Sequence, residues 1–185
     1  MKKTLIAIFF TIGAIGNLCA YQSHNYVEVH LGQTDVALVQ APLDYSHMTI
    51  GGVFGYQMDE NFGAEFLVTF ATEGDAAPLA SQEFATVADV KVNAYGGYFV
   101  ARTSGDFYIE GKLGLAATQF AYTAGGYEDL TETNFGLSYG VGVGYQAAEF
   151  YIEANLLSLP EVDDPYYIQT SYESESILLT VGFDF

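Results

Sequence analysis

The chain has 185 residues, which suits a single domain, and half of them are hydrophobic. The 23 acidic residues outnumber the five basic ones, so the formal net charge is −18, and this excess excludes nucleic acid as a partner because its phosphate backbone is itself anionic. The chain also holds 15 Tyr, 14 Phe and 20 Gly. Because aromatic and β-branched residues favour strands, this composition predicts an all-β protein.

The first 20 residues form a segment of their own. Lys2 and Lys3 precede an apolar stretch, residues 5–15, and the small residue Ala20 follows it. A positive start, an apolar run too short to cross a bilayer and a small closing residue are typical of a secretory signal peptide. We expect cleavage after Ala20, which leaves residues 21–185 as the mature domain.

Cys19 is the single cysteine of the chain. It leaves with the signal peptide, so the mature chain has no disulfide framework. Lipoprotein processing at Cys19 is an alternative, although Asn17 and Leu18 are poor substitutes for the small residues that it needs. Without the signal peptide, the remaining basic residues are Lys91, Arg102 and Lys112.

Alternation of apolar and polar residues recurs in eight segments after Tyr26, which predicts eight strands. Most segments reach the length that a tilted strand needs to cross a bilayer, which is about 9–11 residues. In chain order they cover residues 27–32, 48–58, 62–70, 89–98, 107–115, 135–145, 150–156 and 176–185.

The connections between these segments alternate in length. Those near 59–61, 103–105 and 147–148 are tight. The others are longer and acidic, and lie near 35–44, 74–85, 119–132 and 158–173. Short periplasmic turns and longer extracellular loops are typical of outer-membrane barrels, so we predict an eight-stranded antiparallel up-and-down transmembrane β-barrel.

The alternative is a soluble sandwich or lipocalin-like barrel, in which the apolar face of each strand points inward. The polar faces here are rich in Gly, Ser and Thr rather than in charged residues. This favours a barrel with its apolar faces toward lipid and a polar interior filled by side chains. The glycine-rich segment 135–145 leaves room for Tyr95, Tyr108 and Tyr151 to point inward.

The chain closes on alternating apolar residues that resemble the signal read by the outer-membrane assembly machinery, namely Val181, Phe183 and Phe185. The blocks 55–66, 139–145 and 181–185 resemble the OmpA-like and OmpX-like family of small outer-membrane barrels. This resemblance covers the whole mature chain and implies the fold and a location in the bacterial outer membrane. It implies little about activity. Closure by a single chain makes a monomer the expected state.

Polar residues on the inward faces predict an interior cluster, which comprises Glu28, His30, Glu65, Lys91, Glu110, Lys112 and Glu153. We favour a packed polar plug in which Lys112 and Lys91 pair with glutamates. The alternative is a narrow path for cations or protons.

The connections hold a second acidic set, densest at Glu161, Asp163 and Asp164. Ca²⁺ or Mg²⁺ takes oxygen ligands, so such a set is a candidate for bridging to anionic lipopolysaccharide. The spacing is not that of an EF-hand, and a solvated surface is the simpler interpretation. Host or phage surface molecules are further candidate partners of the loops.

Catalytic patterns are weak. Ser46 and His47 are adjacent, so on a strand they point to opposite faces. There is no zinc spacing or nucleotide fingerprint, and we expect no cofactor. The sequence therefore favours a non-enzymatic structural or surface-interaction protein of the outer membrane. A narrow ion channel is the first alternative, and a lipid A-modifying enzyme is the second.

Overall fold

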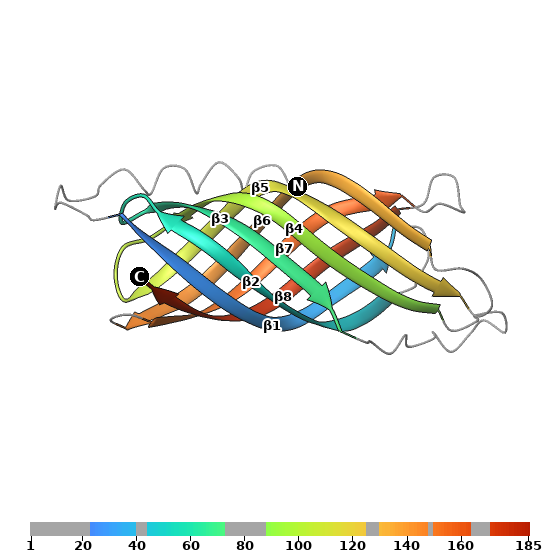
Figure 1. Ribbon diagram of the computed structural model, residues 1–185, viewed down its shortest axis with the longest axis horizontal. Coiled ribbons are helices and arrows are strands. Elements are labelled where there is room, and N and C mark those ends of the chain that lie inside the picture. The colour runs from blue at the N-terminus through green and yellow to red at the C-terminus, as the bar shows by residue number, and fades with distance from the viewer. Residues whose placement is uncertain (1–22, 40–43, 73–87, 125–129, 148–149, 164–170) are drawn as a thin grey trace.

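The computed structural model describes residues 23–39, 44–72, 88–124, 130–147, 150–163 and 171–185. Eight strands form one closed antiparallel barrel, in which each strand pairs with the next and the last with the first (Figure 1). This confirms the predicted fold class. The strands are β1 (His24–Leu38), β2 (Asp44–Gln57), β3 (Phe62–Ala71), β4 (Ala88–Arg102), β5 (Phe107–Ala124), β6 (Leu130–Ala147), β7 (Phe150–Asp163) and β8 (Ser171–Asp184).

Two expectations concern residues that the structure does not describe. The signal peptide, residues 1–20, and Asp164 both lie outside the described ranges, so they stay predictions. No helix in the described ranges is long and apolar enough to cross a membrane.

The barrel closes where β1 meets β8. The amide of Phe185 donates to the carbonyl of Asn25 at 2.9 Å, which joins the end of β8 to the start of β1. The tight turns lie at this same end. In the first turn the Asp59 carboxylate accepts from the amides of Asn61 and Phe62, both at 2.8 Å. In the second, Gly105 has a φ of 117°, a left-handed conformation that glycine adopts without strain. By the usual asymmetry, this is the periplasmic end.

The strands extend further than the alternation pattern predicts. β5 and β6 have 18 residues each, and their pairing continues through Gln119↔Thr133 to Tyr122↔Leu130. These residues were predicted to be loop because they lack an apolar alternation. They still pair because the backbone ladder does not require an apolar outer face, which a strand needs only where it meets lipid. Asp35, Glu161 and Asp163 therefore lie on strands rather than in loops.

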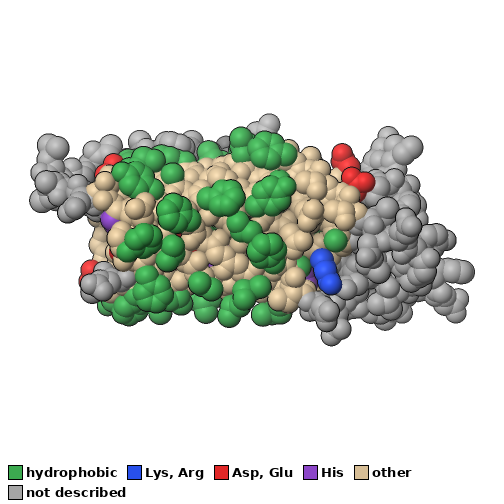
Figure 2. All heavy atoms as spheres, viewed as in Figure 1, with side chains coloured by type: hydrophobic (Ala, Val, Ile, Leu, Met, Phe, Trp, Pro, Cys, Tyr) green, Lys and Arg blue, Asp and Glu red, His purple; other side chains and the backbone are tan. Residues whose placement is uncertain are grey.

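The outer wall of the barrel is apolar. Figure 2 shows hydrophobic side chains over the middle of the visible face and acidic side chains toward its two ends. Along β8, Ile177, Leu179 and Phe183 are more than half exposed, whereas Ser176 and Thr180 on the alternate face are buried. This is the arrangement of a barrel in lipid, where the apolar face points outward.

β4 is the exception to the predicted facing. Tyr98 is 3% exposed and points into the barrel, whereas Tyr95 is 46% exposed on the outer wall. Since strand residues alternate, Lys91 shares the outer face with Tyr95. The predictions that Tyr95 and Lys91 point inward were therefore wrong. β4 also carries apolar residues on its inner face, including Val92 and Val100, so its alternation could not show which face meets lipid.

Candidate functional site

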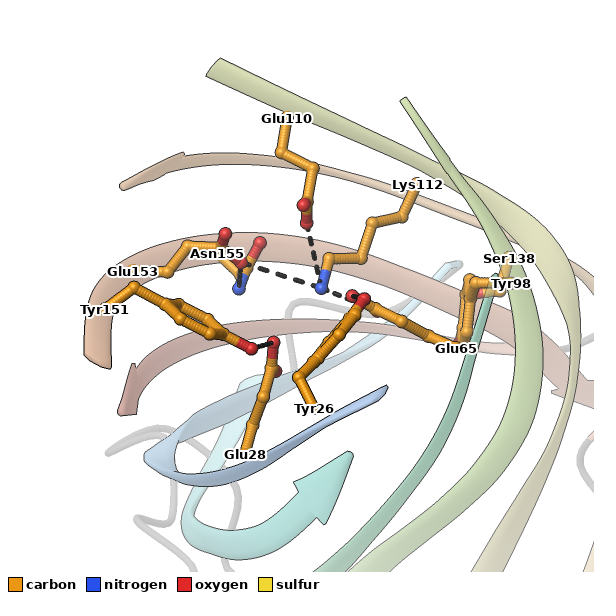
Figure 3. A network of polar contacts seen from close by, with 10 residues as sticks. All are labelled: Tyr26, Glu28, Glu65, Tyr98, Glu110, Lys112, Ser138, Tyr151, Glu153 and Asn155. Atoms are coloured by element: carbon orange, nitrogen blue, oxygen red, sulfur yellow. Dashed lines mark hydrogen bonds and ion pairs between the residues drawn. The ribbon is translucent and has the colours of Figure 1, made fainter. Parts of the chain in front are cut away.

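The charged interior residues meet in the periplasmic half of the barrel, around one ammonium group. Lys112 Nζ lies 2.7 Å from Glu65 Oε2, 3.0 Å from Glu110 Oε1 and 3.6 Å from Glu153 Oε1 (Figure 3). All four side chains are buried. The ion pairs join β3, β5 and β7, so they cross the lumen rather than follow one strand pair.

Tyrosine hydroxyls extend this network to β1. Tyr26 donates to Glu65 Oε1 at 2.7 Å, and Tyr151 donates to Glu28 Oε1 at 2.6 Å. The rings of Tyr26 and Tyr151 meet edge to face, with centroids 6.0 Å apart. Glu28 thus belongs to the same buried network without an ion pair of its own to Lys112.

The charges of the network do not balance. Four buried glutamates surround one buried lysine, and the Asn155 amide donates a further hydrogen bond to Glu153. A buried charge without a partner is strongly destabilising, because water no longer solvates it. Lys112 is therefore the residue on which the stability of this arrangement depends most.

Every charged member lies on an odd-numbered strand, and glycines on the even-numbered strands lie opposite. Glu65 is in register with Gly55, and Glu28 with Gly182. A Cβ at Gly55 would overlap the ring of Tyr26. The glycines therefore provide the space into which the tyrosines and glutamates pack.

An apolar layer follows the charged cluster toward the extracellular end. Leu67 comes two residues after Glu65 on β3, and Leu178 separates Ser176 from Thr180 on β8. Together with Leu157 of β7, these leucines are 2% exposed. They place apolar side chains between the charged cluster and the rest of the lumen.

Two further sets fill the lumen beyond this layer. The hydroxyls of Thr34 and Thr49 are 2.8 Å apart, and those of Thr34 and Ser176 are 2.7 Å apart. Phe120 of β5 then stacks on Tyr172 of β8 across the barrel, with ring centroids 4.6 Å apart. Packed side chains thus occupy the interior at successive heights.

The periplasmic mouth is hollowed. A pocket of about 480 Å³ lies between the turns, with Tyr108 at its wall and Arg102 Cζ 5.4 Å from the centre of that ring. His24, whose Nε2 lies 3.4 Å from Asp184 Oδ1, also lines the pocket.

The structure gathers most of the residues predicted for the interior. The buried ones are Glu28, His30, Glu65, Glu110, Lys112 and Glu153, whereas Lys91 is on the outer wall. The tyrosines that bind the glutamates were not predicted as site residues. Tyr26 could have been found, because it precedes Glu28 by two positions and shares its face. The partner of each tyrosine could not, because it depends on the stagger of distant strands.

The acidic residues predicted as a cation site and the apolar residues at the end of β8 do not form a binding site in the described part of the chain. Glu161 and Asp163 are exposed near the end of β7. In the described part of the chain, no three His, Cys, Asp or Glu side chains come together in a way that could hold a metal ion. Val181, Phe183 and Phe185 lie exposed on the outer wall at the end of β8, and their role in assembly stays a prediction.

Comparison with known proteins places this geometry among outer-membrane proteins. Residues 5–185 match the family model described as outer membrane protein beta-barrel domain. No curated protein matches the chain. Among solved structures, Neisserial surface protein A is similar over 89% of this chain and 99% of its own, with 14% identity and a TM-score of 0.68.

Two further structures share the fold. The attachment invasion locus protein Ail of Yersinia pestis, in complex with the heparin analogue sucrose octasulfate, has 15% identity and a TM-score of 0.61 over 89% of this chain and 99% of its own. OprG of Pseudomonas aeruginosa has 15% identity and a TM-score of 0.57, over 89% and 97%. At these identities the likeness concerns the fold alone.

Proposed function

The chain belongs to the family of outer membrane protein β-barrel domains, and on this premise we propose that it is a non-enzymatic barrel that anchors an acidic, surface-exposed end in the bacterial outer membrane and does not conduct ions. The observation that carries the proposal is the filled lumen. Leu67, Leu157 and Leu178 lie between the charged cluster and the hydroxyl groups beyond it. An ion would have to leave its hydration shell to cross such a layer, which is costly.

The proposed surface role rests on the negative charge of the extracellular end and on the length of the strands that form it. The strands extend beyond the apolar wall at the extracellular end, where Asp35, Glu173 and Glu175 are exposed. Ail was crystallised with a polyanion, but an acidic end repels polyanions and attracts cationic partners. We therefore expect the loops of this protein to bind basic surfaces of host or phage molecules.

The case against catalysis rests on the pair Ser46 and His47. Ser46 is exposed on the outer face of β2, whereas His47 is 3% exposed inside the barrel. A serine nucleophile needs its histidine base within hydrogen-bonding reach. These two side chains lie on opposite sides of the barrel wall and cannot act together.

Planar-bilayer recording tests the proposal against the channel alternative. We expect the wild-type protein to give no single-channel steps, and a Leu67→Ser/Leu157→Ser/Leu178→Ser variant to give them, because the variant replaces the apolar layer by small polar groups. Ile177→Ser is the matched control, since Ile177 is on the outer wall, and it should stay silent. Steady single-channel steps from the wild-type protein would contradict the plugged barrel and favour the narrow-channel alternative.

A further inference from the structure

The buried network holds more carboxyl groups than its lysine can neutralise. Glu28, Glu65, Glu110 and Glu153 are each at most 5% exposed, and Lys112 is the lysine among them. With all four glutamates ionised, the negative charges of this set would exceed its positive charge by three. Close carboxylates that are removed from water together cannot all ionise without a large cost, and such a group keeps a proton.

Glu28 is the glutamate of this network that has no ion pair with Lys112. The other three each have a carboxylate oxygen within 3.6 Å of Lys112 Nζ. Glu28 instead accepts a hydrogen bond at Oε1 from the Tyr151 hydroxyl at 2.6 Å, and Figure 3 shows these two side chains pointing toward each other. Its Oε2 is buried without a hydrogen-bond partner among the described residues. A proton on this carboxyl group removes the cost of an unpaired buried charge.

The surroundings of Glu28 do not bring a second cation to it. The titratable or charged residues that face the network are Tyr26 and His30 of β1, Glu65 of β3, Tyr98 and Arg102 of β4, Tyr108, Glu110 and Lys112 of β5, and Tyr151 and Glu153 of β7. Arg102 lies at the periplasmic mouth, over the ring of Tyr108. His30 is 1% exposed and its Nε2 has no hydrogen-bond partner, so a positive charge there would lack a contact at that nitrogen. Lys112, which the other three glutamates share, therefore remains the cation of the network.

The network lies near water at the periplasmic end of the barrel. The pocket at the periplasmic mouth reaches Tyr108, which precedes Glu110 by two positions and shares its inner face of β5. On the extracellular side, the layer of Leu67, Leu157 and Leu178 follows the network. Protons of the network therefore exchange with the periplasm.

We propose that Glu28 holds a proton in the folded barrel at neutral pH, and that the buried network thereby couples the stability of the barrel to the pH of the periplasm. A glutamate in water has a pKa of about 4.3, so this residue is ionised at neutral pH in the unfolded chain. The folded barrel then binds one proton more than the unfolded chain does. Its stability consequently falls as the pH rises, until the folded barrel also releases the proton. The proposal does not depend on whether the lumen conducts ions.

Infrared spectroscopy tests for the proton directly, because a protonated carboxyl group absorbs apart from ionised carboxylates. The barrel is folded in a detergent that has no carbonyl group. We expect the wild type to show the band of a protonated carboxyl group at neutral pH. Glu28→Gln, which keeps the shape of the protonated side chain, should lose the share of one carboxyl group. Glu175→Gln, on the exposed face of β8, is the matched control and should keep the whole band. No band in the wild type, or an undiminished band in Glu28→Gln, would overturn the proposal.

The pH dependence of unfolding is a second readout. Urea unfolding in lipid vesicles is compared for the wild type and Glu28→Gln between about pH 5 and pH 7, the range above the pKa of a glutamate in water. The histidines titrate in both chains, so the ratio of the two unfolding constants isolates Glu28. We expect this ratio, wild type over variant, to rise about tenfold per pH unit, the effect of one proton. The ratio of wild type to Glu175→Gln should stay constant.

Each variant is first shown to be folded by its heat-dependent mobility in electrophoresis. A ratio of wild type to Glu28→Gln that does not change with pH would contradict the proposal, whatever the stability of the variant at neutral pH. Single-channel recording bears on neither measurement, so this proposal and the plugged barrel fail separately.

Discussion

At the scale of single residues, Lys112 organises the interior. It is the one cation in a buried network with four glutamates, and it contacts three of them within 3.6 Å. Its position on β5 could be predicted from alternation. Its partners could not, because Glu65 and Glu153 come from strands that do not pair with β5 and meet it only through the curvature of the closed barrel.

Replacing Lys112 by Met should lower the free energy of unfolding by about 3–5 kcal/mol, because it leaves buried carboxylates without a counter-charge. Urea unfolding of the barrel in lipid vesicles measures this. Adding Glu65→Gln to the same chain should restore part of the loss. Lys91→Met, on the outer wall, is the matched control and should change stability by less than about 1 kcal/mol. An equal effect of both lysine variants would show that the ion pairs do not stabilise the barrel.

Glycines divide into those that make room inside and those that face lipid. A Cβ at Gly182 would overlap the ring of Tyr151, whereas a Cβ at Gly97 meets open space. We expect Gly182→Ala to destabilise the barrel by about 1–3 kcal/mol through overpacking. Gly97→Ala should leave stability unchanged or raise it slightly, since glycine weakens a strand. The same urea titration compares the two, and equal midpoints would contradict the packing role of Gly182.

At the scale of elements, seven strands have the facing that alternation predicts and β4 does not. On β8, the outer apolar residues alternate with Ser176, Thr180 and Gly182, and Leu178 is the one large apolar residue among them on the inner face, so only one face suits lipid. On β4, the inner residues Val92, Ala94 and Val100 are as apolar as the outer Phe99. Interior packing, not polarity, decides the facing of this strand, and a local pattern carries no information about it.

Tryptophan fluorescence can check the facing of β4, because the chain contains no Trp. Brominated lipids quench a tryptophan that touches their acyl chains. Tyr95→Trp should be quenched, since this side chain is 46% exposed on the outer wall, and Tyr98→Trp should not, since it is inside. Phe99→Trp is a second outward control. Quenching at position 98 but not at position 95 would mean that Tyr98 faces lipid and Tyr95 faces the lumen.

The seam between β6 and β7 is a second feature that the sequence does not show. Their pairing stops at Tyr139↔Ser158. Just beyond this point, the pairing of β7 with β8 shifts its register between Leu159 and Val162. Pro160 lies in this irregular stretch and has no N–H to donate. A side-chain hydrogen bond, from Ser138 Oγ to the carbonyl of Ser158 at 2.6 Å, supports the seam where the ladder ends. The proline alone indicates an edge or a bulge but not which pairing is lost.

At the scale of the whole molecule, strand number, closure and polarity could all be predicted from the chain. They follow from simple requirements: in lipid every backbone polar group must be paired, and only a closed ladder achieves this with strands. The height of the barrel could not be predicted, because above the membrane the strands continue without an apolar pattern.

Electrophoresis of the detergent-folded protein tests closure directly. A barrel whose ladder is complete resists the detergent at room temperature, so we expect the protein to run at one position unheated and to shift after boiling. Deleting residues 177–185, which removes most of β8, should abolish the heat-dependent shift because β1 and β7 lose their common partner. A truncated chain that still shifts would mean that the closure between β1 and β8 contributes little.

The distribution of charge over alternate strands bears on how the barrel enters the membrane. Glu28, Glu65 and Glu153 arrive on β1, β3 and β7, whereas the one lysine of the network lies on β5 beside Glu110, so a hairpin without β5 carries its glutamates without a counter-charge. A partly inserted sheet would expose these charges to hydrocarbon, where each is costly. Insertion of this chain is therefore expected to be all-or-none. Only the closed barrel shields all charges of the buried network from the hydrocarbon.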